Sequence, residues 1–349
     1  MKKRIVFTGG GTAGHIMPNI ALFEHFSKFE IHYIGTSGME KEILKNYPFV
    51  TFHEIECTKL IRSLSLKNLL IPYRLILSVG QASKILKEIN PYFIFSKGGF
   101  VSLPVCIASK KLGIPLFLHE SDKSLGLANR IAKNYATSLF TSFDSIKDKK
   151  AILTGSPMRK EIYLGDREKA KKLLGAHENG KPFLLFVCGS CGAKSINDFV
   201  FSSLSTLLKK YNIIHLTGKN EKRKITQKDY YSLPFCSDIQ HLYALSDFVV
   251  SRGGANALAE IIALKKLCVC IPLSTQSRGD QIENANYYKN KGCLITLMQD
   301  DLSVYSLLYC LNQLDKNREH FLLSMSKQKV DGTNSIVENI RKTMQRIAK

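Results

Sequence analysis

A short apolar strand that runs straight into a glycine-rich turn is the feature that most constrains the fold of this chain. Residues 4–8 read RIVFT, and residues 9–14 read GGGTAG, which satisfies the pattern G-x-G-x-x-G before a helix that starts near His15. Glycines at such a turn permit tight backbone conformations and let backbone N–H groups approach an anion at the helix N-terminus. This order of elements predicts a doubly wound α/β fold with a parallel sheet.

The same signal recurs in the second half, so the 349 residues predict two such domains with a cleft between them. From Lys181 a new strand leads through GSCG into a helix, and a later strand leads through RGG into another. The expected strands are residues 4–8, 31–35, 92–96, 115–118, 151–154, 183–188, 213–217, 248–251 and 267–271. Helices are expected to begin near residues 15, 69, 102 and 125, and a charged helix is expected at residues 167–174.

The net charge of +21 favours polyanionic ligands such as phosphorylated substrates, anionic lipid or nucleic acid. A lysine-rich, well-solvated surface explains the charge equally well. Nucleic-acid binding is the disfavoured class, because the chain has no Trp and the basic stretch 219–228 contains no aromatic side chain on which bases could stack.

The nine cysteines do not suggest a disulfide framework. Most lie in apolar, strand-like runs, their number is odd, and no secretory signal is visible, which favours a reducing, cytosolic compartment. The C-x-x-C of Cys188 and Cys191 is interpreted as a strand-to-helix turn whose Ser190 faces phosphate. A redox or metal site is the less favoured alternative, since no further Cys or His has zinc spacing.

The first glycine turn is not interpreted as a dinucleotide site. Such a site requires an acidic residue about 20 positions further on, at the end of the second strand, for the ribose. Here residues 34–37 read IGTS, without a carboxylate. His15 lies in the first helical turn, where the helix N-terminus lowers a histidine pKa and favours the neutral base. A purely structural histidine is the alternative.

The turn after residues 248–251 predicts a second nucleotide-type site. Arg252 and the following backbone amides can neutralise a diphosphate at the start of a helix. Glu260 follows Asn256 by one helical turn, so a ribose could hydrogen-bond to its carboxylate; an ordinary exposed glutamate is the alternative. Asp280 and Gln281 lie after the next strand, where a sugar could be recognised by its hydroxyls.

In order and spacing, the motifs resemble the MurG family of bacterial peptidoglycan glycosyltransferases over essentially the whole length. That family transfers N-acetylglucosamine from its UDP form to lipid I, giving lipid II. The matching segments are GGTAGH (residues 10–15), KGGFVS (97–102), HE (119–120), GSPMR (155–159), GSCGA (189–193), HLTGK (215–219) and RGGA (252–255).

The resemblance implies a GT-B architecture, with two Rossmann-like parallel-sheet domains facing across a cleft. Residues 1–156 would form the acceptor- and membrane-facing domain, and residues 157–333 the UDP-sugar-binding domain. A C-terminal helix at residues 334–349 would pack back on the first domain.

The resemblance also implies a set of substrate-binding residues, without metal or cofactor. They are Thr12, Ala13, Gly14, Asp122, Arg159, Ser190, Cys236 (through its backbone, at the uracil), Arg252, Ala255, Asn256, Ala257, Leu258, Ala259, Glu260, Asp280 and Gln281. Asp122 and Asp280 stand where the commoner family pattern has Asn and Gln, which leaves their particular contacts open.

Inverting transfer of this kind needs a general base for the acceptor hydroxyl, and base catalysis supplies about 10²–10⁴-fold. His15 is the expected base, with Glu120 as its orienter or as an alternative base. The helix start at residues 254–256, Arg252 and Ser190 are expected to stabilise the departing diphosphate without a metal. Arg159 is expected to reach the donor on domain closure.

The stretch 58–87 predicts contact with a membrane surface. It holds six Lys/Arg and no Asp or Glu around an apolar run too short to span a bilayer, which suits a peripheral surface on anionic lipid; a buried helix face is the alternative. The expected location is the cytoplasmic face of the cell membrane, with UDP-N-acetylglucosamine, lipid I and anionic lipid as partners. Cell-wall synthesis proteins stay open as partners, and nucleic acid is not expected.

Two other enzyme classes fit the same architecture. A UDP-N-acetylglucosamine epimerase would use the same donor site without a lipid acceptor. A different UDP-sugar lipid glycosyltransferase, such as a diglyceride glycosyltransferase, would share both the donor site and the membrane surface.

Overall fold

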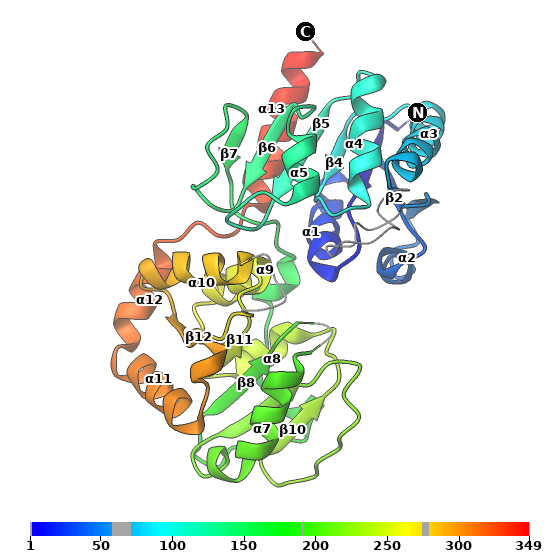
Figure 1. Cartoon of the computed structure of the whole chain (residues 1–349). Coiled ribbons are helices and arrows are strands. Elements are labelled where there is room, and N and C mark those ends of the chain that lie inside the picture. The colour runs from blue at the N-terminus through cyan, green and yellow to red at the C-terminus, as the bar shows by residue number, and fades with distance from the viewer. Residues whose placement is uncertain (1, 58–70, 190–191, 274–278, 349) are drawn as a thin grey trace. The chain divides into compact units, whose positions relative to one another are not determined.

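The computed structural model describes residues 2–57, 71–189, 192–273 and 279–348. The chain divides into two compact units. The first comprises Met1–Arg159 and Asp331–Lys349, and the second comprises Lys160–Val330 (Figure 1). The second unit is therefore inserted into the chain of the first.

The first unit is built on a seven-stranded parallel sheet in the order β3-β2-β1-β4-β5-β6-β7. This order, which reverses beside β1, is that of a doubly wound fold. Its strands are β1 (Arg4–Thr8), β2 (Glu30–Gly35), β3 (Val50–Glu54), β4 (Ile94–Ser96), β5 (Leu116–Glu120), β6 (Ser138–Thr141) and β7 (Ala151–Leu153). Its helices are α1 (Ala13–Phe23), η1 (Glu24–Phe26), α2 (Met39–Leu44), α3 (Ile71–Ile89), α4 (Ser102–Lys111), α5 (Leu127–Ala132) and α13 (Thr333–Ile347).

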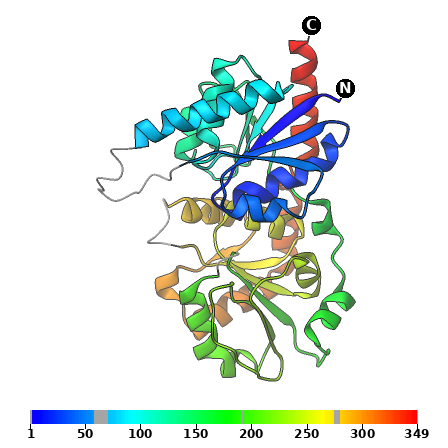
Figure 2. The ribbon, with the colours of Figure 1, turned by 90° about the vertical axis from the view of Figure 1, so that its right-hand side faces the viewer.

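Both faces of this sheet are covered, because successive side chains of each strand point to opposite sides. Ile5 and Phe7 of β1 belong to a core that includes α1 and α13, whereas Val6 belongs to a core that includes α3, α4 and α5. Ile336 and Ile340 of α13 are fully buried in the first of these cores. Figures 1 and 2 both show α13, in red, running beside the sheet of the first unit.

The two places where the chain passes between the units lie side by side in the first unit. Ser156 and Asp331 form a parallel bridge, and Gly332 N donates to Ser156 O at 2.8 Å. Met158 N donates to the Thr333 hydroxyl at 2.8 Å. The departing and returning segments are therefore joined by backbone and side-chain hydrogen bonds.

The second unit repeats the pattern with a six-stranded parallel sheet in the order β10-β9-β8-β11-β12-β13. Its strands are β8 (Phe183–Val187), β9 (Asn212–Leu216), β10 (Tyr230–Leu233), β11 (Phe248–Ser251), β12 (Leu267–Cys270) and β13 (Ile295–Thr296). Its helices are η3 (Lys160–Tyr163), α6 (Arg167–Leu174), α7 (Lys194–Leu207), α8 (Ile239–Leu245), α9 (Ala255–Ala263), α10 (Asp280–Asn290), η4 (Gln299–Asp301), α11 (Val304–Lys316) and α12 (Arg318–Ser326).

The predicted α/β class and the two parallel sheets are confirmed, and each of the nine predicted strands is present. The prediction missed β3, β6, β10 and β13. β3 and β10 are edge strands with partly exposed side chains, β6 is mixed with Ser and Thr, and β13 has only two residues, so none carries a continuous apolar run. Among the described helices, none is long and apolar enough to cross a membrane.

His215 on β9 gives the second unit a built-in acid sensitivity. Its Nδ1 lies 2.9 Å from the Tyr230 hydroxyl and its Nε2 lies 3.0 Å from Asn197 Oδ1. Burial lowers the pKa of His215 from 6.5 to about 4. Below pH 6.5 His215 therefore becomes protonated in the unfolded chain, whereas in the folded protein it stays neutral until the pH falls to about 4.

The free energy of unfolding is expected to fall as the pH is lowered from 6.5 towards 4, by up to roughly 3 kcal/mol from this group. Urea unfolding at pH 7.5 and pH 5 measures this loss. His215→Gln should reduce the difference between the two pH values, whereas His320→Gln, at an exposed histidine of α12, should leave it unchanged. Equal pH dependence in the wild type and His215→Gln would contradict the assignment.

Candidate functional site

The loops that follow β1 and β4 come into close contact at the carboxyl edge of the first sheet. Gly99, in the left-handed region at φ +84°, lies so close to the first loop that a Cβ there would stand 2.6 Å from Gly10 O and 3.0 Å from His15 Nδ1. Glycine is required at this position, because any side chain would force the two loops apart. Two of the sequence motifs, residues 10–15 and 97–102, are thereby brought together.

The first glycine loop is held from beneath by buried side chains. The Tyr33 hydroxyl of β2 donates to Gly9 O at 2.6 Å. Asn19 of α1 donates through Nδ2 to Thr8 O at 3.2 Å and to the Tyr33 hydroxyl at 3.1 Å. The loop backbone is therefore fixed before any ligand binds.

The ring of His15 is oriented by this loop. Its Nδ1 lies 3.0 Å from Gly10 O and 3.2 Å from the Thr12 hydroxyl. A carbonyl oxygen can only accept, so Nδ1 must carry the hydrogen, and the lone pair of the neutral ring is on Nε2. Gly10 O and the Thr12 hydroxyl are thus the groups at Nδ1, and the role of Glu120 as orienter stays a prediction.

Glu120 stabilises the loop that follows β5. Its Oε1 accepts from Asp122 N at 3.1 Å, and its Oε2 accepts from Gly126 N at 2.9 Å and from Asn129 Nδ2 at 3.0 Å. The side chain is only 7% exposed. These contacts fix the backbone at Asp122, and the role of Glu120 as an alternative base stays a prediction.

Lys97, at the end of β4, places a cation beneath the loops. It is 2% exposed, and its Nζ donates to the Ser121 hydroxyl. Burial lowers the pKa of Lys97 to about 8, although the nearby carboxylates of Glu120 and Asp122 act in the opposite direction.

Glu40 of α2 is the site residue that the sequence analysis missed. The end of β2 carries no carboxylate, but the following helix places this one against the glycine loop. Glu40 is fully buried, its Oε2 accepts from Gly11 N at 3.3 Å, and its Oε1 accepts from Thr36 N at 2.9 Å. The signal was available, since an acid that begins a short helix directly after the second strand returns to the same edge of the sheet.

In the second unit, the segments of the expected donor site converge at the start of α9. A Cβ on Gly253 would stand 2.2 Å from Gln281 O, so the turn after β11 and the start of α10 touch through their backbones. Asn284 Nδ2 donates to Gly253 O at 3.1 Å, and Gln281 Oε1 accepts from Leu273 N at 3.0 Å. Asp280 Oδ1 accepts from Gln281 N at 3.1 Å.

The first two turns of α9 hold the remaining predicted donor residues of this segment. Gly254, the residue before the helix, has no side chain with which to cap it. Asn256, Ala257 and Glu260 are half-buried, whereas Ala255, Leu258 and Ala259 are buried and leave only their backbone for a ligand. A helix start of this kind offers backbone N–H groups and the positive end of the helix dipole to an anion.

Arg252 stabilises the second unit internally. Its guanidinium donates to Ile271 O at 3.1 Å, to the Ser195 hydroxyl at 2.8 Å and to Gln299 Oε1 at 2.9 Å. The residue is 8% exposed, and burial lowers the pKa of Arg252. The guanidinium thus joins the ends of β11 and β12 to α7 and η4, and a direct contact with a diphosphate stays a prediction.

The turn after β8 lies beside the end of β9. A Cβ on Gly192 would stand 2.0 Å from Thr217 O, so glycine is needed there. Ser190 and Cys191 lie outside the described residues. Burial raises the pKa of the Cys188 thiol to about 12, which is the behaviour of an inert buried cysteine and not of a redox thiolate.

Cys236, expected at the uracil, lies half-buried in the loop between β10 and α8. Its neighbour Phe235 is 52% exposed, and Lys219 Nζ lies 5.3 Å from the centre of that ring. An exposed aromatic beside the expected nucleobase is a second feature that the sequence analysis did not identify. Arg159 is the last residue of the first unit before the chain enters the second.

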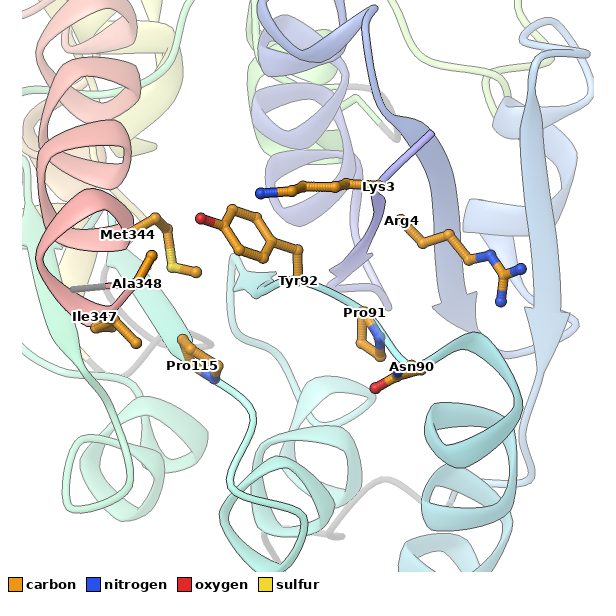
Figure 3. A pocket seen from close by; sticks show the side chains of 9 residues that line it. All are labelled: Lys3, Arg4, Asn90, Pro91, Tyr92, Pro115, Met344, Ile347 and Ala348. Atoms are coloured by element: carbon orange, nitrogen blue, oxygen red, sulfur yellow. The ribbon is translucent and has the colours of Figure 1, made fainter. Parts of the chain in front are cut away.

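In the described parts of the chain, no group of three or more His, Cys, Asp or Glu side chains is arranged to hold a metal ion. A pocket of about 420 Å³ opens at the amino edge of the first sheet, lined by Lys3, Tyr92 and Met344 among others (Figure 3). The Nζ of Lys3 lies 3.9 Å from the centre of the Tyr92 ring. Ligands of such sheets bind at the carboxyl edge, so this pocket is not part of the candidate site.

Two family models match the chain. Residues 5–141 match the glycosyltransferase family 28 N-terminal domain, and residues 183–344 match the glycosyltransferase family 28 C-terminal domain.

Curated relatives match over nearly the full length. A Clostridium perfringens protein is 42% identical over 98% of this chain and 99% of its own, and a Clostridium tetani protein is 39% identical over 98% of each. Both are named UDP-N-acetylglucosamine--N-acetylmuramyl-(pentapeptide) pyrophosphoryl-undecaprenol N-acetylglucosamine transferase.

Solved structures share the two-domain fold. MurG of Acinetobacter baumannii has a TM-score of 0.75 at 22% identity, covering 97% of this chain and 99% of its own. The UDP-GlcNAc 2-epimerase of Neisseria meningitidis has a TM-score of 0.65 at 12% identity, covering 99% of this chain and 100% of its own. At these identities the likeness shows the fold, which transferases and epimerases share.

Gly99→Ala is expected to destabilise the first unit more than Gly113→Ala does. Both glycines have positive φ, +84° and +67°, so both substitutions incur the same type of backbone strain. Only Gly99 faces a backbone atom at 2.6 Å, whereas a Cβ on Gly113 meets nothing within 4 Å. The extra crowding should cost about 1–3 kcal/mol in the free energy of unfolding, measured by urea titration. Equal losses for the two variants would show that the two loops do not constrain each other.

Proposed function

Since this chain belongs to glycosyltransferase family 28 and, within it, to the MurG family, we propose that it transfers N-acetylglucosamine from UDP-N-acetylglucosamine to lipid I, forming lipid II. The observation that carries the proposal is the 42% identity to the Clostridium perfringens transferase over 98% of the chain. The match covers both units of the chain. Within this proposal the first unit binds the lipid acceptor and the second binds the UDP-sugar.

The second unit supplies the donor site. The start of α9 offers backbone N–H groups and a helix dipole to the diphosphate, and the half-buried Glu260 carboxylate suits the ribose hydroxyls. The exposed ring of Phe235 suits stacking on the uracil, beside the backbone of Cys236. In this proposal Gln281, whose Oε1 accepts from Leu273 N, donates through its Nε2 to the sugar.

His15 serves as the general base in the first unit. Its Nε2 takes the proton of the acceptor hydroxyl while that oxygen attacks the anomeric carbon of N-acetylglucosamine. The bond from that carbon to the diphosphate breaks, UDP leaves with the electron pair, and a single displacement inverts the configuration. The Nδ1–H hydrogen bond to Gly10 O, at 3.0 Å, fixes the tautomer that this step requires.

The negative charge that develops on UDP is met by the fixed dipoles at the start of α9, so the reaction needs neither a metal nor a cofactor. Preorganised N–H donors aimed at a developing anion need no reorganisation during the reaction. Arg159 contributes a further positive charge to the donor.

The acceptor is a lipid, and helix α3 offers a surface for its membrane. Its inner side is buried at Val79, Ala82 and Leu86, whereas Tyr73, Ile76 and Leu77 are 62%, 70% and 49% exposed. Ile76 and Leu77 follow Tyr73 by about one helical turn, so the three side chains share one face. Their exposure favours a membrane-contacting surface over a wholly buried helix. Of the six basic residues in the stretch 58–87, Lys59, Arg62 and Lys67 lie outside the described residues, whereas Arg74, Lys84 and Lys87 are exposed on α3. We place the protein on the cytoplasmic face of the cell membrane as a peripheral protein.

Transfer of radiolabel from UDP-N-acetylglucosamine to a lipid I analogue tests the function. The wild type should give a labelled lipid product without added divalent metal, and EDTA should leave the rate unchanged. His15→Ala should lower kcat by about 10²-fold or more while donor binding is retained. Free N-acetylmannosamine without a lipid product would instead identify an epimerase, and a near wild-type kcat in His15→Ala would remove that residue as the base.

Co-sedimentation with vesicles tests the membrane surface. Binding should rise with anionic lipid content and fall with added salt, because lysine and arginine charges are screened. Ile76→Ser with Leu77→Ser should weaken binding by about 10-fold or more, since two apolar side chains no longer enter the lipid. Tyr305→Ser, at an 82% exposed aromatic of α11, is the matched control and should bind normally. Binding that depends neither on salt concentration nor on anionic lipid content would contradict the proposed membrane-contacting surface.

A further inference from the structure

The structure places a buried carboxylate one peptide group away from His15. We propose that Glu40 is a positioning residue that acts on His15 through the peptide group between Gly10 and Gly11. The inference rests on the proposed function in that it takes His15 as the general base. It adds a member to the catalytic machinery that lies on a different element, α2, and cannot itself touch a substrate.

The carboxylate of Glu40 is surrounded by donors. Its Oε1 accepts from Thr36 N at 2.9 Å and from the Thr36 hydroxyl at 2.6 Å, and its Oε2 accepts from Gly11 N at 3.3 Å. Three donors and no acceptor match the ionised carboxylate, which can only accept hydrogen bonds. A hydrogen-bond-accepting carboxyl group therefore lies directly behind the glycine loop.

The two hydrogen bonds on the loop side belong to one peptide group. Gly11 N–H and Gly10 C=O are the two ends of the same planar amide. The N–H points to Glu40 Oε2 at 3.3 Å, and the C=O accepts from His15 Nδ1 at 3.0 Å. The sequence of contacts is thus carboxylate, amide, imidazole, with each hydrogen bond polarising the next.

Packing fixes this arrangement. A Cβ on Gly10 would stand 2.6 Å from Glu40 Oε1, and a Cβ on Gly35 would stand 2.8 Å from Glu40 Cγ. Glu40 is fully buried, so it can neither rotate away nor reach a ligand. Glycine at both positions is what allows the carboxylate to approach the loop backbone.

Among the described residues, Tyr33 and Lys97 also pack against the loop, and neither replaces Glu40. The Tyr33 hydroxyl donates to Gly9 O, one peptide before the amide in question. Lys97 Nζ donates a hydrogen bond to the Ser121 hydroxyl, and the Lys97 Cβ lies 3.2 Å from the position of a Cβ on Gly9. A lysine carries the wrong sign of charge to stabilise an imidazolium, so Lys97 cannot take the role that the proposal assigns to Glu40.

The chemical consequence concerns the proton that His15 accepts. Polarisation by Glu40 makes Gly10 O a stronger acceptor, which holds the Nδ1–H tautomer and keeps the lone pair on Nε2. When Nε2 takes the acceptor's proton, the ring becomes positive and the same carboxylate stabilises it. A carboxylate that contacts a catalytic histidine directly does the same in hydrolases, and here an amide transmits the effect.

The alternative is that Glu40 only ties α2 to the loop. The two roles predict different results for Glu40→Gln, because glutamine keeps the shape and an oxygen acceptor but loses the charge. If Glu40 only connects α2 to the loop, the pKa of His15 should be unchanged in Glu40→Gln. If the charge of Glu40 acts on His15, His15 should be a weaker base in Glu40→Gln even though the fold is intact.

The experiment compares Glu40→Gln with Glu42→Gln in the lipid I transfer assay. Glu42 is the matched control, since it lies on the same helix, is exposed and pairs with Lys45 at 2.8 Å. Glu40→Gln should lower kcat by about 10-fold, with KM for UDP-N-acetylglucosamine unchanged, and should move the acid limb of the kcat profile to lower pH. Glu42→Gln should match the wild type in all three. An unmoved acid limb in Glu40→Gln would overturn the proposal.

A readout without turnover separates this inference from the assignment of the base. Nitrogen-15 NMR of labelled histidine, assigned with His15→Gln, reports the tautomer and the pKa of His15. Glu40→Gln should lower that pKa and reduce the Nδ1–H population relative to the wild type and Glu42→Gln. If His15→Ala keeps full turnover, the assignment of His15 as the base is wrong, but the effect of Glu40 on the NMR titration can still be observed. If His15 is needed for turnover but its pKa is the same in Glu40→Gln and the wild type, only the inference about Glu40 is wrong. Glu40→Asp, which keeps the charge, should recover part of the shift.

Discussion

The amide between Gly10 and Gly11 is the group on which the acceptor-side site depends. Its carbonyl orients His15, its N–H contacts Glu40, and Gly99 packs directly against it. Three elements that are distant in sequence therefore converge on one peptide group at the carboxyl edge of the sheet. A backbone amide serves this purpose well, because it is planar and polar at both ends and has no side-chain freedom to lose.

The sequence predicted the two parallel sheets because their central strands are continuous apolar runs bounded by glycine turns. Strands β1, β8 and β11 are of this kind, and all three were predicted. Edge strands such as β3 were not predicted, because their partly exposed side chains give a pattern of apolar and polar residues that resembles that of a loop. Strand order, and with it the neighbours of each loop, follows from long-range pairing that local periodicity does not encode.

The same limit explains which site residues could be found. His15 and Glu260 lie within motifs, so residue type and spacing sufficed to predict them as site residues. Glu40 lies outside any motif, and its role depends on a contact with Gly11 that exists only once α2 has folded back over β2. Arg252 was found, but its buried bonds to Ser195 and Gln299 depend on distant elements that the motif does not include.

The pairing of Ser156 with Asp331 has a consequence for how the chain is made. Because the second unit is inserted between residues 159 and 331, helix α13 is synthesised after the whole of that unit. Yet Ile336 and Ile340 complete the core that covers β1. The first domain to begin synthesis is therefore the last to be finished, because its core lacks Ile336 and Ile340 until the final helix has been synthesised.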